Sequence, residues 1–169
     1  MKKLILIRHA KSWFKNTDMI DFDRPLSDRW IEETKFVWKI LKDLDIKADL
    51  ILCSSAKRTR ETLEWIREEL DANNEKIIYD KGIYDYHFDE SLDYYINLIS
   101  KVYNDKEVVV MIWHNPYVTR LVRYLSWNNN LWMETLWVAI LNFEIEKWEG
   151  IKSNKGNISF FLSPKNLMK

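Results

Sequence analysis

The sequence predicts an α/β domain, a three-layer sandwich in which helices flank a central, mostly parallel sheet. Strand-like and helix-like segments alternate along the chain, which is typical of layered α/β folds. The runs Leu4–Ile7 and Val108–Ile112 are apolar without alternation, as expected for strands buried on both faces of a parallel sheet. At roughly 150 residues per domain, the 169 residues form a single domain, residues 1–169.

Six short β-branched runs predict strands, and four amphipathic stretches predict helices. The strands are expected at Lys3–Arg8, Asp49–Ser54, Lys76–Tyr79, Glu107–Trp113, Leu136–Ile145 and Asn157–Leu162. The helices are expected at 28–44, 57–71, 90–103 and 116–126, with Ser27 capping the first and Asp89 the third. The last two strands follow each other without a helix, which predicts an antiparallel hairpin or sheet edge.

Composition and charge exclude several classes of protein. Hydrophobic residues make up 47% of the chain and charged residues 31%, which excludes a disordered or collagen-like protein. Lys and Arg number 26, as do Asp and Glu, so the chain has no net charge. We therefore expect no nucleic-acid partner, since such a protein needs a basic excess to neutralise phosphates.

The sequence also predicts a cytoplasmic protein that does not engage a membrane. No apolar run approaches the roughly 18 residues that a membrane helix needs. The apolar run Leu4–Ile7 is interrupted by Arg8, well short of the roughly 7–15 residues of a signal sequence. A single cysteine, Cys53, cannot form an internal disulfide, which fits a reducing compartment.

Three segments with cationic or imidazole side chains each follow a predicted strand. They are Arg8-His9-Ala10-Lys11-Ser12, Ser54-Ser55-Ala56-Lys57-Arg58 and His114-Asn115-Pro116. Because ligands of open α/β sheets bind at the carboxyl ends of strands, these segments are expected to converge in one pocket. The side chains expected there are Arg8, His9, Arg58 and His114. Guanidinium forks match phosphate oxygens, and helix N-termini add donors, so the pocket predicts a phosphoryl ligand.

A neutral histidine in such a pocket can attack phosphorus and form a phosphohistidine intermediate, while arginines neutralise the phosphoryl oxygens. This chemistry requires no metal and no cofactor. Taken singly, an Arg-His pair after a strand is more often a surface pair, and His-Asn-Pro is more often a turn. The acidic run Asp21-Phe22-Asp23 is interpreted as solvated, since no histidine or cysteine completes a metal site there.

The motifs together resemble the SixA-type phosphohistidine phosphatases of the histidine phosphatase superfamily, branch 1, which also contains the phosphoglycerate mutases. The matching segments are Ile7-Arg8-His9-Ala10-Lys11-Ser12, Asp23-Arg24-Pro25-Leu26-Ser27, Ser54-Ser55-Ala56-Lys57-Arg58 with Thr62, His114-Asn115-Pro116, and 160–167. The resemblance implies a phosphoglycerate mutase-like fold and a nucleophilic His9. It implies that Arg8, Arg58 and His114 hold the phosphoryl group. It also implies that Lys11, Ser12 and Arg24 line the rim.

The superfamily often adds a carboxylic general acid from a loop after the third strand. Residues 83–90 contain no clear family acid, and Asp85 is the candidate; the alternative is a solvated loop carboxylate. An alkoxide leaving group needs a proton, whereas the imidazole of phosphohistidine departs readily. The lack of a clear general acid in this loop therefore favours phosphohistidine on a protein, rather than a sugar phosphate, as the substrate.

The spacing of the motifs favours an open site, because the stretch between Arg58 and Glu107 already holds a strand and a helix and leaves little chain for a lid. We therefore expect a metal-independent phosphatase that acts on a histidine-phosphorylated phosphotransfer or phosphocarrier protein. The alternatives are a small-molecule phosphomonoesterase or mutase with the same site, and a non-catalytic phosphate-binding module.

The chain has three glycines and nine tryptophans, although average usage predicts about a dozen glycines. Five tryptophans stand where the resembled family has glycine: Trp30, Trp38, Trp113, Trp127 and Trp137. Some bacterial lineages read UGA as glycine, so we hypothesise that these five are UGA-encoded glycines translated as tryptophan. The alternative is a family variant with true tryptophans, which UGG codons would establish. An indole at Trp113, beside His114, is expected to crowd the phosphate pocket.

Overall fold

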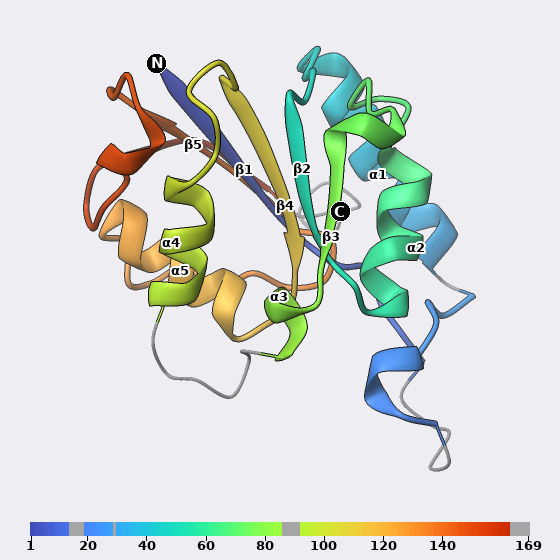
Figure 1. Cartoon of the computed structure of the whole chain (residues 1–169). Helices are drawn as coiled ribbons and strands as arrows, with labels where there is room; N and C mark the ends of the chain where they lie inside the picture. Colours follow the sequence, from blue (N-terminus) through green and yellow to red (C-terminus); the bar gives the residue numbers. More distant parts are fainter. Residues whose placement is uncertain (14–18, 29, 86–91, 163–169) are drawn as a thin grey trace.

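The computed structural model describes residues 1–13, 19–28, 30–85 and 92–162, and for residues 31–33 and 36 it describes the backbone alone. Within these ranges, one six-stranded sheet has the order β3-β2-β4-β1-β5-β6 (Figure 1). Its strands are β1 (Lys2–Arg8), β2 (Leu50–Ser54), β3 (Ile77–Asp80), β4 (Val108–Trp113), β5 (Val138–Phe143) and β6 (Gly156–Leu162). The predicted α/β sandwich is confirmed.

Helices cover both faces of the sheet, with α1 and α2 on one side and α4 and α5 on the other (Figure 1). The helices are α1 (Trp30–Asp43), α2 (Lys57–Ile66), α3 (Gly82–Asp85), α4 (Asp93–Ser100) and α5 (Tyr117–Ser126). Short 3-10 turns lie at η1 (Asp21–Asp23), η2 (Asn74–Lys76) and η4 (Trp148–Gly150). The one-turn helix α3 was not expected from the sequence. The predicted cap Asp89 lies outside the described residues.

The sheet is parallel through β3, β2, β4 and β1, and β5 runs antiparallel to both of its neighbours. The predicted antiparallel edge of β5 and β6 is therefore confirmed. Helix α2 ends at Ile66, before the expected residue 71. The chain leaves the helix there through turns that end at Asp71, whose φ of 51° is left-handed and incompatible with a continuing helix.

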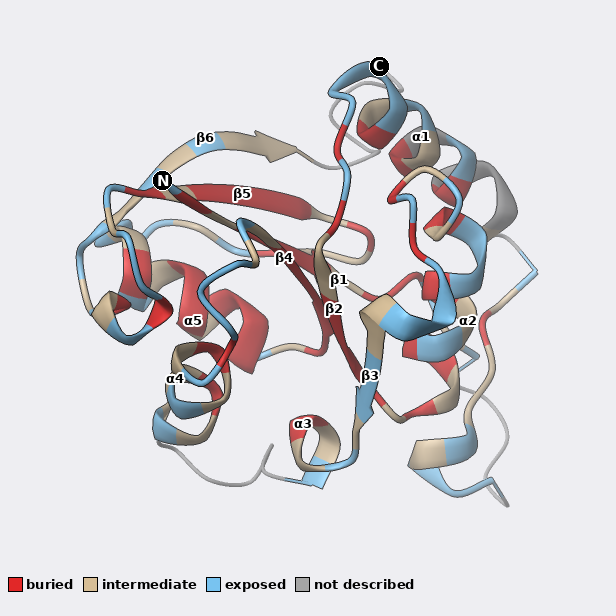
Figure 2. Cartoon of the chain, turned by 45° about the horizontal axis from the view of Figure 1, so that its top comes forward, coloured by how far each residue is buried: buried red, intermediate tan, exposed pale blue. Residues whose placement is uncertain are grey.

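The non-alternating apolar runs belong to strands that are buried on both faces. Leu4 and Leu6 pack in the core beneath α4 and α5, whereas Ile5 and Ile7 pack in the core beneath α1 and α2. All four side chains are fully buried, and Figure 2 shows that β1, β2, β4 and β5 are mostly buried while β6 is more exposed. This double burial fixes the inner parallel strands and therefore the place where their carboxyl ends meet.

Ser27 does not cap α1 with its side chain as predicted. Its backbone N–H donates to Lys11 O at 2.8 Å, and its carbonyl accepts from Trp30 N–H at 3.0 Å. The buried Oγ has no hydrogen-bond partner among the described residues. Ser27 instead ties the start of α1 to the segment that follows β1, which helps to hold the edge of the pocket described below.

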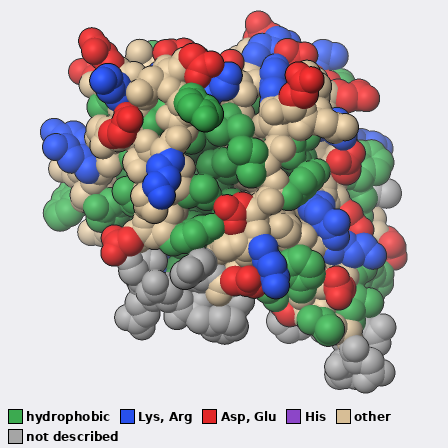
Figure 3. Space-filling model, in the orientation of Figure 1, with side chains coloured by type: hydrophobic (Ala, Val, Ile, Leu, Met, Phe, Trp, Pro, Cys, Tyr) green, Lys and Arg blue, Asp and Glu red, His purple; other side chains and the backbone are tan. Residues whose placement is uncertain are grey.

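The surface carries charges of both signs. Figure 3 shows Lys and Arg side chains interspersed with Asp and Glu side chains over the visible face. This mixture agrees with the zero net charge of the sequence. In the part of the chain that the structure describes, no helix combines the length and apolar character needed to cross a bilayer.

The backbone distinguishes two of the tryptophans that the sequence marks as glycine sites. Trp127 follows α5 with φ 57° and ψ 22°, the left-handed conformation that glycine adopts at the end of a helix. Its side chain is 67% exposed, so little packing offsets the strain. Trp38 lies inside α1, where its ring lies 4.6 Å from Lys42 Nζ. The conformation of Trp127 supports the glycine hypothesis, and that of Trp38 does not.

We predict that Trp127→Gly raises the free energy of unfolding by about 1 kcal/mol, because it relieves a left-handed non-glycine residue. Trp38→Gly should lower it by about 1 kcal/mol, because glycine destabilises a helix interior. Urea unfolding of both variants against the parent chain measures these changes. A Trp127→Gly protein that unfolds at lower urea than the parent would contradict the prediction.

Candidate active site

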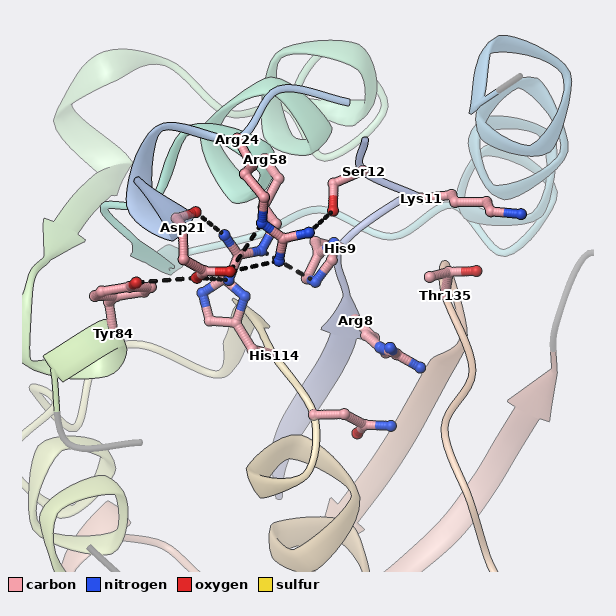
Figure 4. A pocket seen from close by; sticks show the side chains of 11 residues that line it. Arg8, His9, Lys11, Ser12, Asp21, Arg24, Arg58, Tyr84, His114 and Thr135 are labelled. Carbon is pink, nitrogen blue, oxygen red and sulfur yellow. Dashed lines mark hydrogen bonds and ion pairs between the residues drawn. The ribbon is translucent and has the colours of Figure 1, made fainter. Parts of the chain in front are cut away.

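A pocket of about 530 Å³ lies at the carboxyl ends of β1, β2 and β4 (Figure 4). It is lined by Arg8, His9, Lys11, Ser12, Asp21, Arg24, Arg58, Tyr84, His114, Asn115 and Thr135. Seven of the eight side chains proposed from the sequence are among these; Asp85 is not. The convergence follows from topology, because neighbouring parallel strands bring their following segments to one edge of the sheet.

His9 is held as a neutral imidazole with one nitrogen directed to Arg58. Its Nδ1 lies 2.6 Å from Ala10 O, and because a carbonyl only accepts, Nδ1 carries the proton. Nε2 therefore keeps its lone pair and accepts from Arg58 Nε at 3.3 Å. Burial, then the nearby Arg58 cation, lowers the pKa of His9 to about 3. At neutral pH, Nε2 is unprotonated and has the lone pair that nucleophilic attack requires.

Thr62 links the nucleophile segment to α2. Its Oγ1 accepts from Ala10 N–H at 3.0 Å and donates to Arg58 O at 2.7 Å. The contact joins the residue that orients His9 to the helical turn that carries Arg58. Thr62, fully buried, therefore fixes the separation between the imidazole and the guanidinium.

Arg8 and Arg58 place two guanidiniums in the pocket. Arg8 Nη1 donates to Met133 O at 2.9 Å, while its buried Nε has no hydrogen-bond partner among the described residues. Arg58 is 5% exposed and enters from the first turn of α2. Burial lowers the pKa of each guanidinium, but arginine stays charged at neutral pH. Both side chains can therefore neutralise a phosphoryl group.

His114 is oriented by Ser54, a residue of the sequence motif to which we had assigned no role. Ser54 Oγ lies 2.8 Å from His114 Nε2, and Ser54 is fully buried at the end of β2. The His114 and His9 rings lie 5.1 Å apart between centroids. Ser54 is therefore a positioning residue for the second imidazole.

Asp21 is a pocket residue that the sequence interpretation missed. Its Oδ1 accepts a hydrogen bond from Arg24 Nε at 2.8 Å and forms an ion pair with Arg24 Nη2 at 2.6 Å. Its Oδ2 accepts from Arg58 Nη2 at 3.1 Å and from Tyr84 Oη at 2.9 Å. Burial alone would raise the pKa of Asp21, but Arg58, Tyr84 and Arg24 outweigh it and lower the pKa. The interpretation of this carboxylate as merely solvated needs correction.

Helix α3 presents Tyr84 to the pocket instead of Asp85. Asp85 is half-exposed and pairs with Lys81 at 3.7 Å, one helical turn away, so the structure does not bring it to the site. The Tyr84 ring packs edge-on against His114, and its hydroxyl reaches Asp21. Burial, with the nearby Asp21, raises the pKa of Tyr84 to about 12.

Trp113 does not crowd the pocket, contrary to the expectation from the sequence. Side chains alternate along β4, so Trp113 joins the core beneath α4 and α5. Its Nε1 donates to Ile83 O at 2.9 Å, and its ring lies 3.8 Å from that of Tyr95 between centroids. Trp113 is fully buried, contacts the backbone of α3 and lies outside the lining of the pocket.

Comparison with known proteins supports the motif-based resemblance. The family description for the histidine phosphatase superfamily (branch 1) matches residues 4–125. A 70-residue segment is 41% identical to an uncharacterised chloroplastic protein of Arabidopsis thaliana, covering 41% of this chain and 32% of that protein. The match thus spans about a third of the length of that relative.

Solved structures share the fold over nearly the whole chain. A candidate phosphohistidine phosphatase SixA of Agrobacterium tumefaciens has a TM-score of 0.79 at 22% identity, covering 96% of this chain and 98% of its own. The protein histidine phosphatase SixA complexed with tungstate has a TM-score of 0.76 at 20% identity, covering 98% and 99%. A mycobacterial glucosyl-3-phosphoglycerate phosphatase has a TM-score of 0.68 at 11% identity, covering 96% and 99%. At these identities, the likeness establishes the fold alone.

We predict that the His9 ring, followed by NMR, does not titrate between pH 8 and pH 5. Its pKa is about 3 in the folded protein against an ordinary value of 6.5. Between these two values the unfolded chain binds a proton that the folded chain does not, so stability is lost as pH falls. The contribution of His9 is about 1.4 kcal/mol per pH unit in this range.

Urea unfolding at pH 7 and pH 5 provides the second measurement, with His9→Gln as the comparison. The stability of the parent chain should fall more steeply with acid than that of His9→Gln. A His9 ring that titrates near its ordinary value would show that the pocket does not hold it neutral.

Proposed function

Because this chain belongs to the histidine phosphatase superfamily, branch 1, we propose that it hydrolyses phosphohistidine on a protein through a covalent phospho-His9 intermediate. Membership of the superfamily supports phosphatase activity. The choice of phosphohistidine rests on the side chains of the pocket.

In the first step, His9 Nε2 attacks phosphorus in line and forms a new N–P bond. The N–P bond of the substrate breaks, and its electron pair goes to the departing imidazole. The guanidiniums of Arg8 and Arg58, together with His114, stabilise the charge on the equatorial phosphoryl oxygens. The proton on Nδ1, held by Ala10 O, keeps the positively charged phospho-imidazole oriented.

In the second step, water attacks the phosphorus of phospho-His9. The N–P bond to His9 breaks, its electron pair returns to Nε2, and inorganic phosphate forms. Each step exchanges one bond to phosphorus for another and requires no redox partner. The cationic side chains of the pocket supply the charge neutralisation, so we expect activity without an added metal or cofactor.

The weak supply of protons in the pocket is the observation that carries the substrate assignment. Asp21 is the one carboxylate among the described lining residues, and its cationic neighbours keep it ionised. Tyr84 has a pKa of about 12, so it releases its proton reluctantly. A serine or sugar alkoxide needs a strong acid to depart, whereas a protonated imidazole departs as a neutral ring. The pocket therefore suits a phosphoramidate better than an ester.

We propose that the substrate is a phosphotransfer or phosphocarrier protein in the cytoplasm. Exposed Lys11 and half-buried Arg24 lie at the rim, where they can contact a macromolecule that carries the phosphoryl group. The spacing of the motifs leaves little chain for a lid between Arg58 and Glu107, and an open site suits a protein substrate, because a protein covers the site with its own surface. Zero net charge makes a nucleic-acid substrate a poor fit.

We predict that the protein releases phosphate from a histidine-phosphorylated protein without added metal and that His9→Ala abolishes this release. Asp85→Asn is the matched control, and it should retain activity because Asp85 lies outside the pocket. Phosphate release is measured in parallel with p-nitrophenyl phosphate, an ester with a good leaving group.

Each contrary outcome identifies an alternative function. Efficient turnover of small phosphate esters, with no release from the phosphoprotein, would favour a small-molecule phosphomonoesterase or mutase. Phosphate binding with no release from any substrate would favour a non-catalytic binding module. The buried position of Trp113 removes the steric reason for expecting that module.

A further inference from the structure

The N–H groups with which Arg58 could bind a phosphoryl group already donate to acceptors within the protein. Its Nε donates to His9 Nε2 at 3.3 Å, and its Nη2 donates to Asp21 Oδ2 at 3.1 Å. Its Nη1 donates to the backbone carbonyl of Asp21 at 2.7 Å. Bidentate binding of two phosphoryl oxygens uses adjacent N–H groups of this kind. A phosphoryl group and the Asp21 carboxylate therefore compete for Arg58.

Asp21 engages a second guanidinium in the same way. Its Oδ1 accepts a hydrogen bond from Arg24 Nε and forms an ion pair with Arg24 Nη2, and its Oδ2 is shared by Arg58 and Tyr84 (Figure 4). One anion thus contacts two cations and a phenol in the lining of the pocket. This is the donor set that would surround the oxygens of a bound phosphoryl group.

The charge balance of the pocket makes simultaneous occupancy unfavourable. The described lining residues include four cationic side chains and one carboxylate, which is Asp21. A phosphoryl group brings a charge of about −1.5 to −2 at neutral pH. Beside Asp21 it would meet a like charge at short range, and the two anions would repel each other.

Asp21 is also placed where it can withdraw. It lies on the three-residue turn η1, and its side chain is 51% exposed, so leaving Arg58 does not require the core to unpack. The carboxylate exchanges its half-exposed ion pairs with Arg58 and Arg24, and the hydrogen bond from Tyr84, for contacts with water, and solvent screening keeps the cost small. By contrast, Arg58 is held by burial and by the first turn of α2, so the carboxylate is the member of the pair that moves.

We infer that the Asp21 carboxylate occupies the donors of Arg58 and Arg24 while the pocket is empty and moves away from them when the phosphoryl group of the substrate binds. After hydrolysis it competes with product phosphate for the same donors. This inference rests on the proposed function, since it assigns the same pocket to a phosphoryl ligand. Asp21 acts through the arginines and is therefore a positioning residue. Its return to Arg58 would help to expel phosphate after hydrolysis.

The test is the affinity of inorganic phosphate for Asp21→Asn, measured by isothermal titration calorimetry on the full chain. Asparagine keeps the shape of the side chain and removes the competing charge. We expect phosphate to bind about twofold to fivefold more tightly, the scale of a half-exposed ion pair. The KM for p-nitrophenyl phosphate and the inhibition constant of phosphate should fall together.

Asp23→Asn is the matched control, because Asp23 is an exposed carboxylate on the same turn and outside the pocket lining. It should leave phosphate affinity unchanged. Equal tightening in both variants would overturn the inference, because it would reflect a general loss of negative charge.

Phosphate binding that is unchanged or weaker in Asp21→Asn would also overturn the inference. A purely structural role for Asp21 predicts this weakening, since the arginines would lose their anchor. Asp21→Ser, which removes the charge and most of the side chain, must shift the affinity in the same direction as Asp21→Asn. Calorimetry measures binding without turnover, so the two proposals fail separately. If Asp21→Asn binds phosphate more tightly while the parent chain hydrolyses no substrate, the role of Asp21 is upheld and the proposed hydrolysis is rejected.

Discussion

The adjacency of three parallel strands is the constraint on which the site depends. In the order β2-β4-β1, the segments that follow each strand are brought to one edge of the sheet. His9, Arg58 and His114 come from separate parts of the chain and meet there because the strands that precede them are parallel neighbours in the sheet. A pocket lined by these side chains therefore follows from the order of the parallel strands.

Electrostatics gives this arrangement its chemistry. Burial and the neighbouring Arg58, the arginine that would bind a phosphoryl group, lower the pKa of His9, so this imidazole is neutral at neutral pH. The contact between Nδ1 and Ala10 O determines which nitrogen is free to react. Asp21 relieves the repulsion between Arg24 and Arg58 in the empty site, and its own pKa is lowered in return. One cluster of charges thus sets the state of the nucleophile and the affinity for the ligand.

The sequence predicted the parts of the structure that periodicity and strand ends determine. The apolar runs at β1 and β4 predicted double burial, and residues directly after strands predicted the locations of His9 and His114. Asp21 and Tyr84 were missed because a 3-10 turn and a one-turn helix leave no periodic pattern in the sequence. Tyr84 and Asp85 are consecutive residues of α3, so a shift of one position along this helix would exchange the phenol for the carboxylate at the pocket. The orientation of Trp113 depends on the face of the sheet to which its position in β4 directs the side chain. Its proximity to His114 in the sequence does not reveal that face.

Detection of phosphate on His9 tests the central claim most directly. The protein is mixed briefly with a histidine-phosphorylated donor protein, and the modified residue is located by mass spectrometry under alkaline conditions, where phosphohistidine survives. Nucleophilic attack by His9 predicts one phosphoryl group on His9 and no label in His9→Gln. Turnover without a labelled enzyme in rapid-quench samples, or a label that persists in His9→Gln, would contradict nucleophilic attack by His9.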